Sequence, residues 1–96
     1  MSQGIPSIEA LESVHSFPGS YTIKAIGDND PAFVERVHNC IKDCLDSNEF
    51  LQDSKERVSS KGNHISVTAV LHVQTANKVR ILYQELLKVE QLRMLL

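Results

Sequence analysis

Two segments of the chain alternate apolar and polar residues, which is the pattern of a half-buried β-strand. In the first, residues 21–27, one face takes Tyr21, Ile23 and Ala25. In the second, which starts at His64, the alternation is stronger, and one face takes Ile65, Val67, Ala69, Leu71 and Val73. We expect both segments to be strands of an antiparallel sheet that buries one face.

Two other segments repeat their apolar residues at intervals of three and four, which predicts amphipathic helices. The first begins at Pro31, after the N-cap candidate Asp30, and ends near Leu45. Its apolar stripe comprises Phe33, Val34, Val37, Cys40, Ile41 and Cys44. The second helix follows Thr75, and its apolar stripe comprises Val79, Leu82, Tyr83, Leu86 and Leu87.

The remaining segments complete the sheet. Residues 49–58 alternate poorly and are rich in charge, which predicts an irregular edge strand, because charges discourage edge-to-edge pairing. A turn over residues 59–63 joins this strand to the next as a hairpin. Residues 89–96 predict a last strand with Leu92, Met94 and Leu96 on the core side. Arg93 then lies on the face of the sheet that no helix covers.

The predicted order is β-α-β-β-α-β over residues 17–96, a single ferredoxin-like domain of the α+β class. We expect a sandwich of a four-stranded antiparallel sheet with two helices on one face. Right-handed crossovers place the first and third strands in the middle and the second and fourth at the edges. Residues 1–16 form a short N-terminal arm, in which the spacing of Ile8 and Leu11 fits a short helix.

Charge and composition exclude several classes of function. The 96 residues carry 10 basic and 12 acidic side chains, a net charge of −2, whereas proteins that bind nucleic acid or anionic membranes usually carry a basic excess. Residues 1–48 hold three basic and seven acidic residues, and residues 49–96 hold seven and five. Opposite-signed halves fit either solvated surface charge or self-association. We expect no nucleic-acid partner.

The start of the chain shows no signal peptide, and no apolar run approaches the ~20 residues that a membrane span needs. We therefore expect a cytoplasmic protein that does not bind membranes. Cys40 and Cys44, with His38 nearby, raise the alternative of a metal site, because residues four apart share a helix face. Both cysteines lie on an apolar stripe, however, so we expect them to pack against the core. We expect no metal, no cofactor and no catalytic residue.

The most suggestive polar cluster is the turn Ser59, Ser60, Lys61, Gly62 and Asn63. Backbone N–H groups near a glycine, two hydroxyls and a lysine can hold a carboxylate or a phosphate. The alternative is a hairpin turn whose glycine and asparagine supply the required backbone angles. Arg93 is the other candidate contact, since a partly apolar, uncovered sheet face with an arginine is typical of a protein-association surface.

The string Ser59-Ser60-Lys61-Gly62-Asn63, followed by Ser66-Val67, resembles the signature of the YbeD-like family of small bacterial proteins. The later strings Leu82-Tyr83-x-Glu85-Leu86-x-Lys88 and Arg93-Met94-x-Leu96 resemble it too, and the resemblance covers residues 17–96. It implies a ferredoxin-like fold similar to that of ACT regulatory domains. ACT domains bind small effectors, often amino acids, at interfaces between paired domains, and associate through side-by-side sheets or helix contacts.

From these observations we expect a non-enzymatic bacterial regulatory or protein-interaction module of the ACT-like type. The open sheet face and the resemblance favour a homodimer through the sheet, with an unidentified protein partner or small effector. The alternative is a sensor that binds a metabolite or an amino acid. An enzyme or a metal carrier is the least favoured class, because the sequence shows no catalytic constellation and no ligand spacing.

Overall fold

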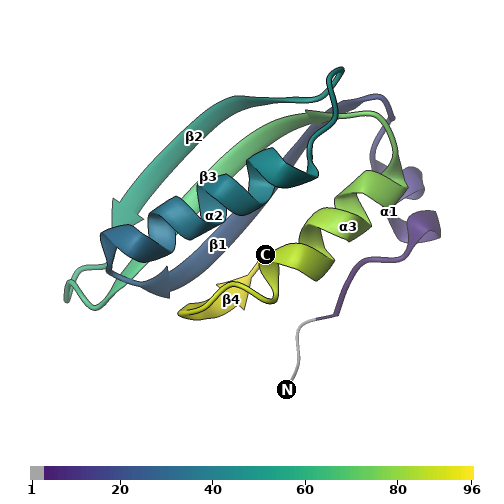
Figure 1. The fold of residues 1–96 in the computed structure, drawn as a ribbon. Helices are drawn as coiled ribbons and strands as arrows, with labels where there is room; N and C mark the ends of the chain where they lie inside the picture. The colour runs from purple at the N-terminus through teal and green to yellow at the C-terminus, as the bar shows by residue number, and fades with distance from the viewer. Residues whose placement is uncertain (1–3) are drawn as a thin grey trace.

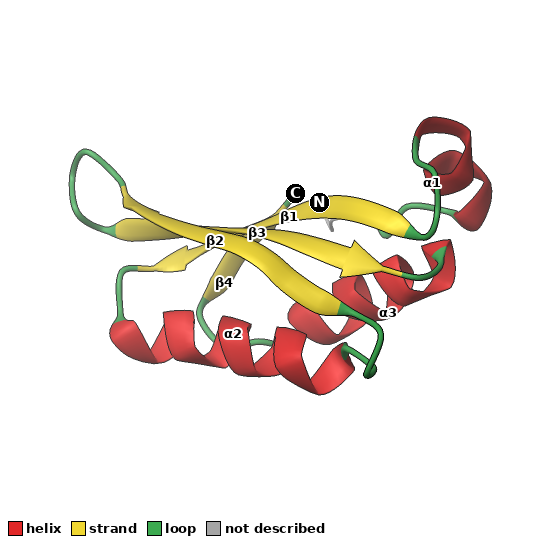
Figure 2. Ribbon diagram, turned by 90° about the horizontal axis from the view of Figure 1, so that it is seen from above, coloured by secondary structure: helices red, strands yellow, loops and turns green. Residues whose placement is uncertain are grey.

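The computed structural model describes residues 4–96, which form one antiparallel sheet with the two long helices packed on one side (Figure 1). In chain order the elements are α1 (Ile8–Val14), β1 (Gly19–Asp28), α2 (Pro31–Cys44), β2 (Phe50–Val58), β3 (His64–Val73), α3 (Ala76–Leu86) and β4 (Leu92–Leu95). The strand order is β2-β3-β1-β4, so β1 and β3 are central, as predicted. Figure 2 shows α2 and α3 under one face of the sheet and the other face uncovered. The ferredoxin-like α+β fold is thereby confirmed.

The helices begin where side chains can cap them. The carboxylate of Asp30 accepts a hydrogen bond from the N–H of Ala32 at the start of α2. The hydroxyl of Thr75 accepts one from the N–H of Lys78 at the start of α3. Each such cap contributes about 1 kcal/mol, because it satisfies a backbone donor that the helix leaves unpaired. Among residues 4–96, no helix has both the length and the apolar content to cross a bilayer.

The core lies between the sheet and the two long helices. Alternate residues of β1 and β3 point toward the helices and are almost fully buried. The largest fully buried side chains are Phe33, Ile23, Ile41, Leu71, Leu82, Leu86, Val37, Val67, Val73 and Val79. Full burial of such a side chain stabilises the fold by roughly 1.5–3 kcal/mol relative to exposure.

The short helix α1 docks on α3 (Figure 1). Its Leu11 is 3% exposed and belongs to the core cluster. The guanidinium Nε of Arg80, on α3, donates a hydrogen bond of 3.0 Å to the carbonyl of Pro6, just before α1. The arm is therefore held by apolar contacts, to which Ile5 also contributes, and by a hydrogen bond.

The last strand differs from the expected assignment of faces. Leu95 is 4% exposed, whereas Met94 and Leu96 are 45% and 54% exposed. The cause is an irregularity in the β1–β4 ladder: Ile26 pairs with Met94, but Gly27 pairs with Leu92, so Arg93 is an extra residue. An extra residue shifts the alternation of faces by one. The prediction was therefore wrong for Met94 and Leu96, which lie on the uncovered face, and correct for Leu92, which packs against the core.

The end of β1 requires a glycine because other parts of the chain approach it closely. A Cβ on Gly27 would overlap the ring of Phe33 and lie 2.6 Å from the carbonyl oxygen of Gln91. Neither neighbour can withdraw easily, since Phe33 is fully buried and the Gln91 carbonyl accepts a hydrogen bond from the N–H of Asp28 at 3.1 Å. The loop between β1 and α2 is thus packed directly against the residues that precede β4.

We expect Gly27→Ala to lower the free energy of unfolding by about 3 kcal/mol, because the added methyl overpacks a site that cannot relax. The matched control is Gly62→Ala, where a Cβ would meet nothing within 4 Å but φ is +78°. That strain is worth only about 1 kcal/mol. Urea denaturation measures both values, and equal losses would contradict the packing argument.

Candidate functional site

The uncovered face of the sheet brings three basic side chains together from two strands that are not adjacent. Lys24 of β1 and Lys55 of β2 both pair with Thr68 of β3, one from each side. Two residues along β2, Arg57 pairs with Ser66 of β3. Because side chains alternate between the faces of a sheet, all five lie on the side opposite the helices.

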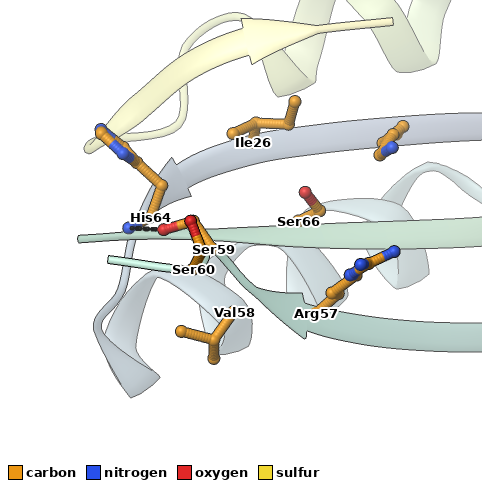
Figure 3. Close-up of a pocket in the computed structure, with 8 residues that line it drawn as sticks. Ile26, Arg57, Val58, Ser59, Ser60, His64 and Ser66 are labelled. Atoms are coloured by element: carbon orange, nitrogen blue, oxygen red, sulfur yellow. Dashed lines mark hydrogen bonds between the residues drawn. The ribbon is translucent and has the colours of Figure 1, made fainter. Parts of the chain in front are cut away.

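These five residues line two adjoining hollows, which we call together the basic groove. The first hollow, of about 540 Å³, also reaches Ile26, Val58, Ser59, Ser60 and His64 (Figure 3). The second, of about 370 Å³, is lined in addition by Glu56. Lys24, Arg57 and Ser66 line both hollows, so the two form one continuous concave surface.

The positive charges of the basic groove are not neutralised by the chain itself. Within residues 4–96, the cations that form ion pairs are Arg36, Lys78, Lys88 and Arg93. Lys24, Lys55 and Arg57 form none in that part of the chain. Glu56 pairs with Val67, whose side chain is buried toward the helices, so the register directs the Glu56 carboxylate to the opposite face. Uncompensated like charges in a concave surface attract anions.

The predicted turn lies at one end of the basic groove, and Ser59 and Gly62 hold its shape. The Ser59 hydroxyl accepts a hydrogen bond from the N–H of His64 at 3.1 Å, drawn as a dashed line in Figure 3. The Gly62 N–H donates to the Ser59 carbonyl at 2.9 Å, and its positive φ closes the turn. Both residues therefore stabilise the hairpin turn, and Ser59 also lines the groove.

The other end of the turn is anchored to the loop between β1 and α2. The side-chain amide of Asn29 donates to the carbonyl of Gly62 at 2.9 Å, and its N–H donates to the carbonyl of Asn63 at 3.1 Å. Ser60 and Lys61 are exposed, and of these two only Ser60 lines the groove. The turn contributes hydroxyls to one wall of the groove, but it does not converge on a site of its own.

Arg93, the remaining predicted contact, lies on β4 with its charge already paired. Its Nε donates to Asp28 Oδ1 at 2.9 Å, and a second guanidinium nitrogen donates to Oδ2 at 3.3 Å. This bidentate contact with Asp28 raises the pKa of Arg93. Neither hollow of the basic groove includes Arg93 among its lining residues.

Cys40 and Cys44 line a separate hollow between α2 and α3, together with Lys78 and Glu85. Both thiols are partly buried and pack at the margin of the core, as predicted. Burial, reinforced by Cys44, raises the pKa of Cys40 to about 12, and burial also raises the pKa of Cys44. In the described part of the chain, no group of three His, Cys, Asp or Glu side chains is placed to hold a metal ion.

A buried carboxylate links the loops at the far end of the sheet. The side chain of Glu49 is 1% exposed and accepts hydrogen bonds from the N–H groups of Asp46 and Gln74, both at 3.0 Å. Lys78 lies 3.4 Å from the same carboxylate and 3.2 Å from that of Asp46. All these contacts are internal, so Glu49 and Lys78 join the start of β2 to the start of α3.

A family model described as a protein of unknown function (DUF493) matches residues 12–96. The chain belongs to this family. A UPF0250 protein of Vibrio cholerae is 35% identical over 94 residues, which is 96% of this chain and 97% of the relative. A UPF0250 protein of Buchnera aphidicola is 30% identical over 86 residues, 90% of this chain and 94% of the relative. These matches confirm the resemblance to the YbeD-like family.

Two solved structures show the same fold in proteins of low sequence identity. The ACT domain from the GTP pyrophosphokinase of Chlorobium tepidum has a TM-score of 0.65 at 12% identity, covering 80% of this chain and 94% of that domain. The C-terminal domain of the MgtC protein from Mycobacterium tuberculosis has a TM-score of 0.67 at 21% identity, covering 80% of this chain and 82% of that one. At such identities the likeness establishes the ACT-like fold and leaves function to the site.

We expect Glu49→Gln to lower the free energy of unfolding by about 2–3 kcal/mol. The amide keeps the shape but replaces one buried acceptor by a donor and leaves Lys78 without its buried partner. Glu90→Gln is the control, because the Glu90 side chain is 80% exposed. Its effect should stay within about 0.5 kcal/mol in the same urea titration. A similar loss in both variants would show that Glu49 has no special role.

The thiol of Cys40 should react slowly, because a thiol with a pKa of about 12 is protonated at pH 8. We expect alkylation by iodoacetamide at pH 8 to be at least about tenfold slower in the native chain than in urea. Trypsin separates Cys40 and Cys44 into different peptides, so mass spectrometry measures each rate. Equal rates at Cys40 in native and unfolded protein would refute the raised pKa of this thiol in the folded chain.

Proposed function

We propose that this chain is a non-enzymatic, cytoplasmic regulatory or protein-interaction module of the ACT-like type, which forms a homodimer through its sheet. The observation that supports this proposal is an apolar strip on the uncovered face, defined by Ile26, Met94 and Leu96. Ile26 pairs with Met94 across the β1–β4 ladder, and Leu96 exchanges two backbone hydrogen bonds with Lys24. Met94 and Leu96 are each about half exposed.

A second copy of the chain is the partner that this strip fits best. Soluble proteins rarely leave adjoining apolar side chains uncovered without a use for them. The edge of β2 is an unsuitable alternative for association, since it carries Asp53, Lys55, Glu56 and Arg57. The likeness to ACT domains, which pair through side-by-side sheets or helix contacts, favours the sheet as the interface.

The titratable groups of the interior support a non-enzymatic role. Glu49 and Lys78 are engaged with each other and with the backbone. The hydroxyls of Tyr21 and Tyr83 are hydrogen-bonded to each other at 3.1 Å, and burial raises the pKa of Tyr83. Catalytic groups with shifted pKa values usually face a cleft that admits substrate. In the described residues these groups are held by structural partners, although Lys78 also lines the hollow between α2 and α3.

A small-molecule sensor is the second candidate, and the basic groove supports it better than the loop between β1 and α2. ACT domains typically bind effectors at a glycine-containing loop in that position. Here Gly27 is packed against Phe33, and the Asp30 carboxylate accepts hydrogen bonds from Ala32 and from the side chain of Gln91. The hydrogen bond from Gln91 is the main cause of the lowered pKa of Asp30. The loop thus presents a paired carboxylate, which repels an amino-acid carboxylate.

We expect the chain to be a dimer at about 100 μM, and Met94→Glu to weaken the dimer at least about tenfold, because a two-fold interface buries the new charge twice. Size-exclusion chromatography with light scattering over a range of concentrations measures the dissociation constant. Val14→Glu is the matched control, since Val14 is 77% exposed on α1, away from the strip. A monomeric parent chain, or equal weakening by both variants, would count against the sheet-mediated dimer.

A further inference from the structure

We propose that the basic groove binds a small, multiply charged oxyanion, one that carries two or more phosphate or carboxylate groups. Three cations of the chain converge there without internal counter-charges, although the whole chain has a net charge of −2. A general surface excess of positive charge therefore does not explain the cluster. Bringing three like charges together costs free energy, which an anion of opposite charge recovers.

The register fixes how the three cations surround a ligand. Lys24 and Lys55 stand on either side of Thr68, with their backbones about 10 Å apart, since neighbouring strands are spaced by about 4.8 Å. Arg57 follows Lys55 by two residues, about 7 Å along β2. The lysines provide flexible point charges, and the guanidinium of Arg57 provides a planar pair of donors that matches the two oxygens of a carboxylate or phosphate.

Hydroxyl groups lie on the floor of the groove, where an anion needs neutral donors. Ser66 and Thr68 are partly buried. Thr68 lies between Lys24 and Lys55, and Ser66 lies between Ile26 and Arg57. Within residues 4–96, neither hydroxyl forms a side-chain hydrogen bond, so both can donate to a ligand. Ser60, in the hairpin turn at the rim, adds a further hydroxyl to the groove (Figure 3).

The surroundings of the groove favour a small ligand over a nucleic acid. Along β2 the next residue on the same face is Asp53, opposite Val70, which ends the positive potential in that direction. Beyond Asp53, the rings of Phe50 and His72 stack on each other, with centroids 5.0 Å apart and an angle of 17° between the ring planes. They are therefore not free to stack on bases. The hollows, of about 540 and 370 Å³, have the volume of ordinary small-molecule sites.

The test is a titration of the ¹⁵N-labelled full chain by NMR at constant ionic strength, with inorganic pyrophosphate in one arm and citrate in the other. We expect saturable shifts at the amides of Lys24, Ser66 and Thr68 with at least one of the two anions. The arm that binds more tightly identifies the preferred group as phosphate or carboxylate. Shifts that are linear with concentration, or spread evenly over the chain, would overturn the proposal.

Two substitutions that each remove one positive charge distinguish binding in the groove from general electrostatic attraction of the anion to the protein. Arg57→Gln should weaken binding about tenfold, as expected for the loss of a bidentate charged contact. Lys42→Gln, on the exposed side of α2, should change it less than about twofold. Both side chains are exposed, so both variants should fold. Equal effects of the two substitutions would overturn the proposal.

Two more measurements distinguish this proposal from two alternatives, a site that needs a second copy of the chain and a site for nucleic acid. Met94→Gln should bind the anion as tightly as the parent chain, because Met94 does not line the groove and the substitution adds no charge beside Lys24; a lost response would refute a groove complete within one chain. This result is independent of whether the parent chain is a dimer. A single-stranded oligonucleotide that binds far more tightly than either anion, and does so through Arg57, would replace the small ligand by a nucleic acid.

Discussion

The structure depends on the long antiparallel pairing of β1 with β3. It runs without interruption from Gly19 opposite Val73 to Asp28 opposite His64. Every residue of both central strands is thereby assigned to one face or the other, because side chains alternate along a strand. The inward set forms half of the core, and α2 and α3 supply the other half. The outward set includes Lys24, Ser66 and Thr68, so the same ladder that builds the core also aligns the basic groove.

The two ends of this ladder are held by different chemistry. At one end the buried carboxylate of Glu49 ties the start of β2 to the residues after β3. At the other end, Asn29 joins the β2–β3 turn to the loop that leaves β1, and Gln91 joins that loop to β4. The connections between strands are therefore bound to one another as well as to the strands. Such cross-links keep the edge strands in register, on which the relative positions of Lys55, Arg57 and Met94 depend.

Most of the fold could be predicted from the sequence, because the central strands and both long helices have clear periodicity and capping residues. The hairpin turn was also predictable, since Gly62 supplies the positive φ that it requires. The faces of β4 could not be predicted in the same way. One extra residue, Arg93, interrupts the ladder there, and neither composition nor spacing marks it. As a result, Leu95 faces the core and Met94 lies on the uncovered face, the reverse of the expected assignment.

The basic groove escaped prediction for a related reason. The spacing of Lys55 and Arg57 by two residues indicates a common face, but which face depends on the pairing of β2 with β3. That ladder also has an irregularity, between Leu51 and Asp53, which resets the alternation before the two basic residues. Lys24 lies more than thirty residues away in the sequence, and only the strand order brings it opposite the same Thr68. A cluster assembled across three strands leaves no local signal in the chain.

The chemistry of the outer face explains why the sheet carries a single layer of helices. A second layer would have to bury Lys24, Lys55 and Arg57 without partners, and the loss of their hydration would cost several kcal/mol for each charge. The apolar strip on the β4 side gains from being covered, whereas the groove on the β2 side must stay open to solvent or to an anion. These opposite requirements lie side by side on β1, where Ile26 faces Met94 and Lys24 is two residues away. A sheet face that carries an apolar strip beside a basic groove suits reversible contacts that cover only part of it.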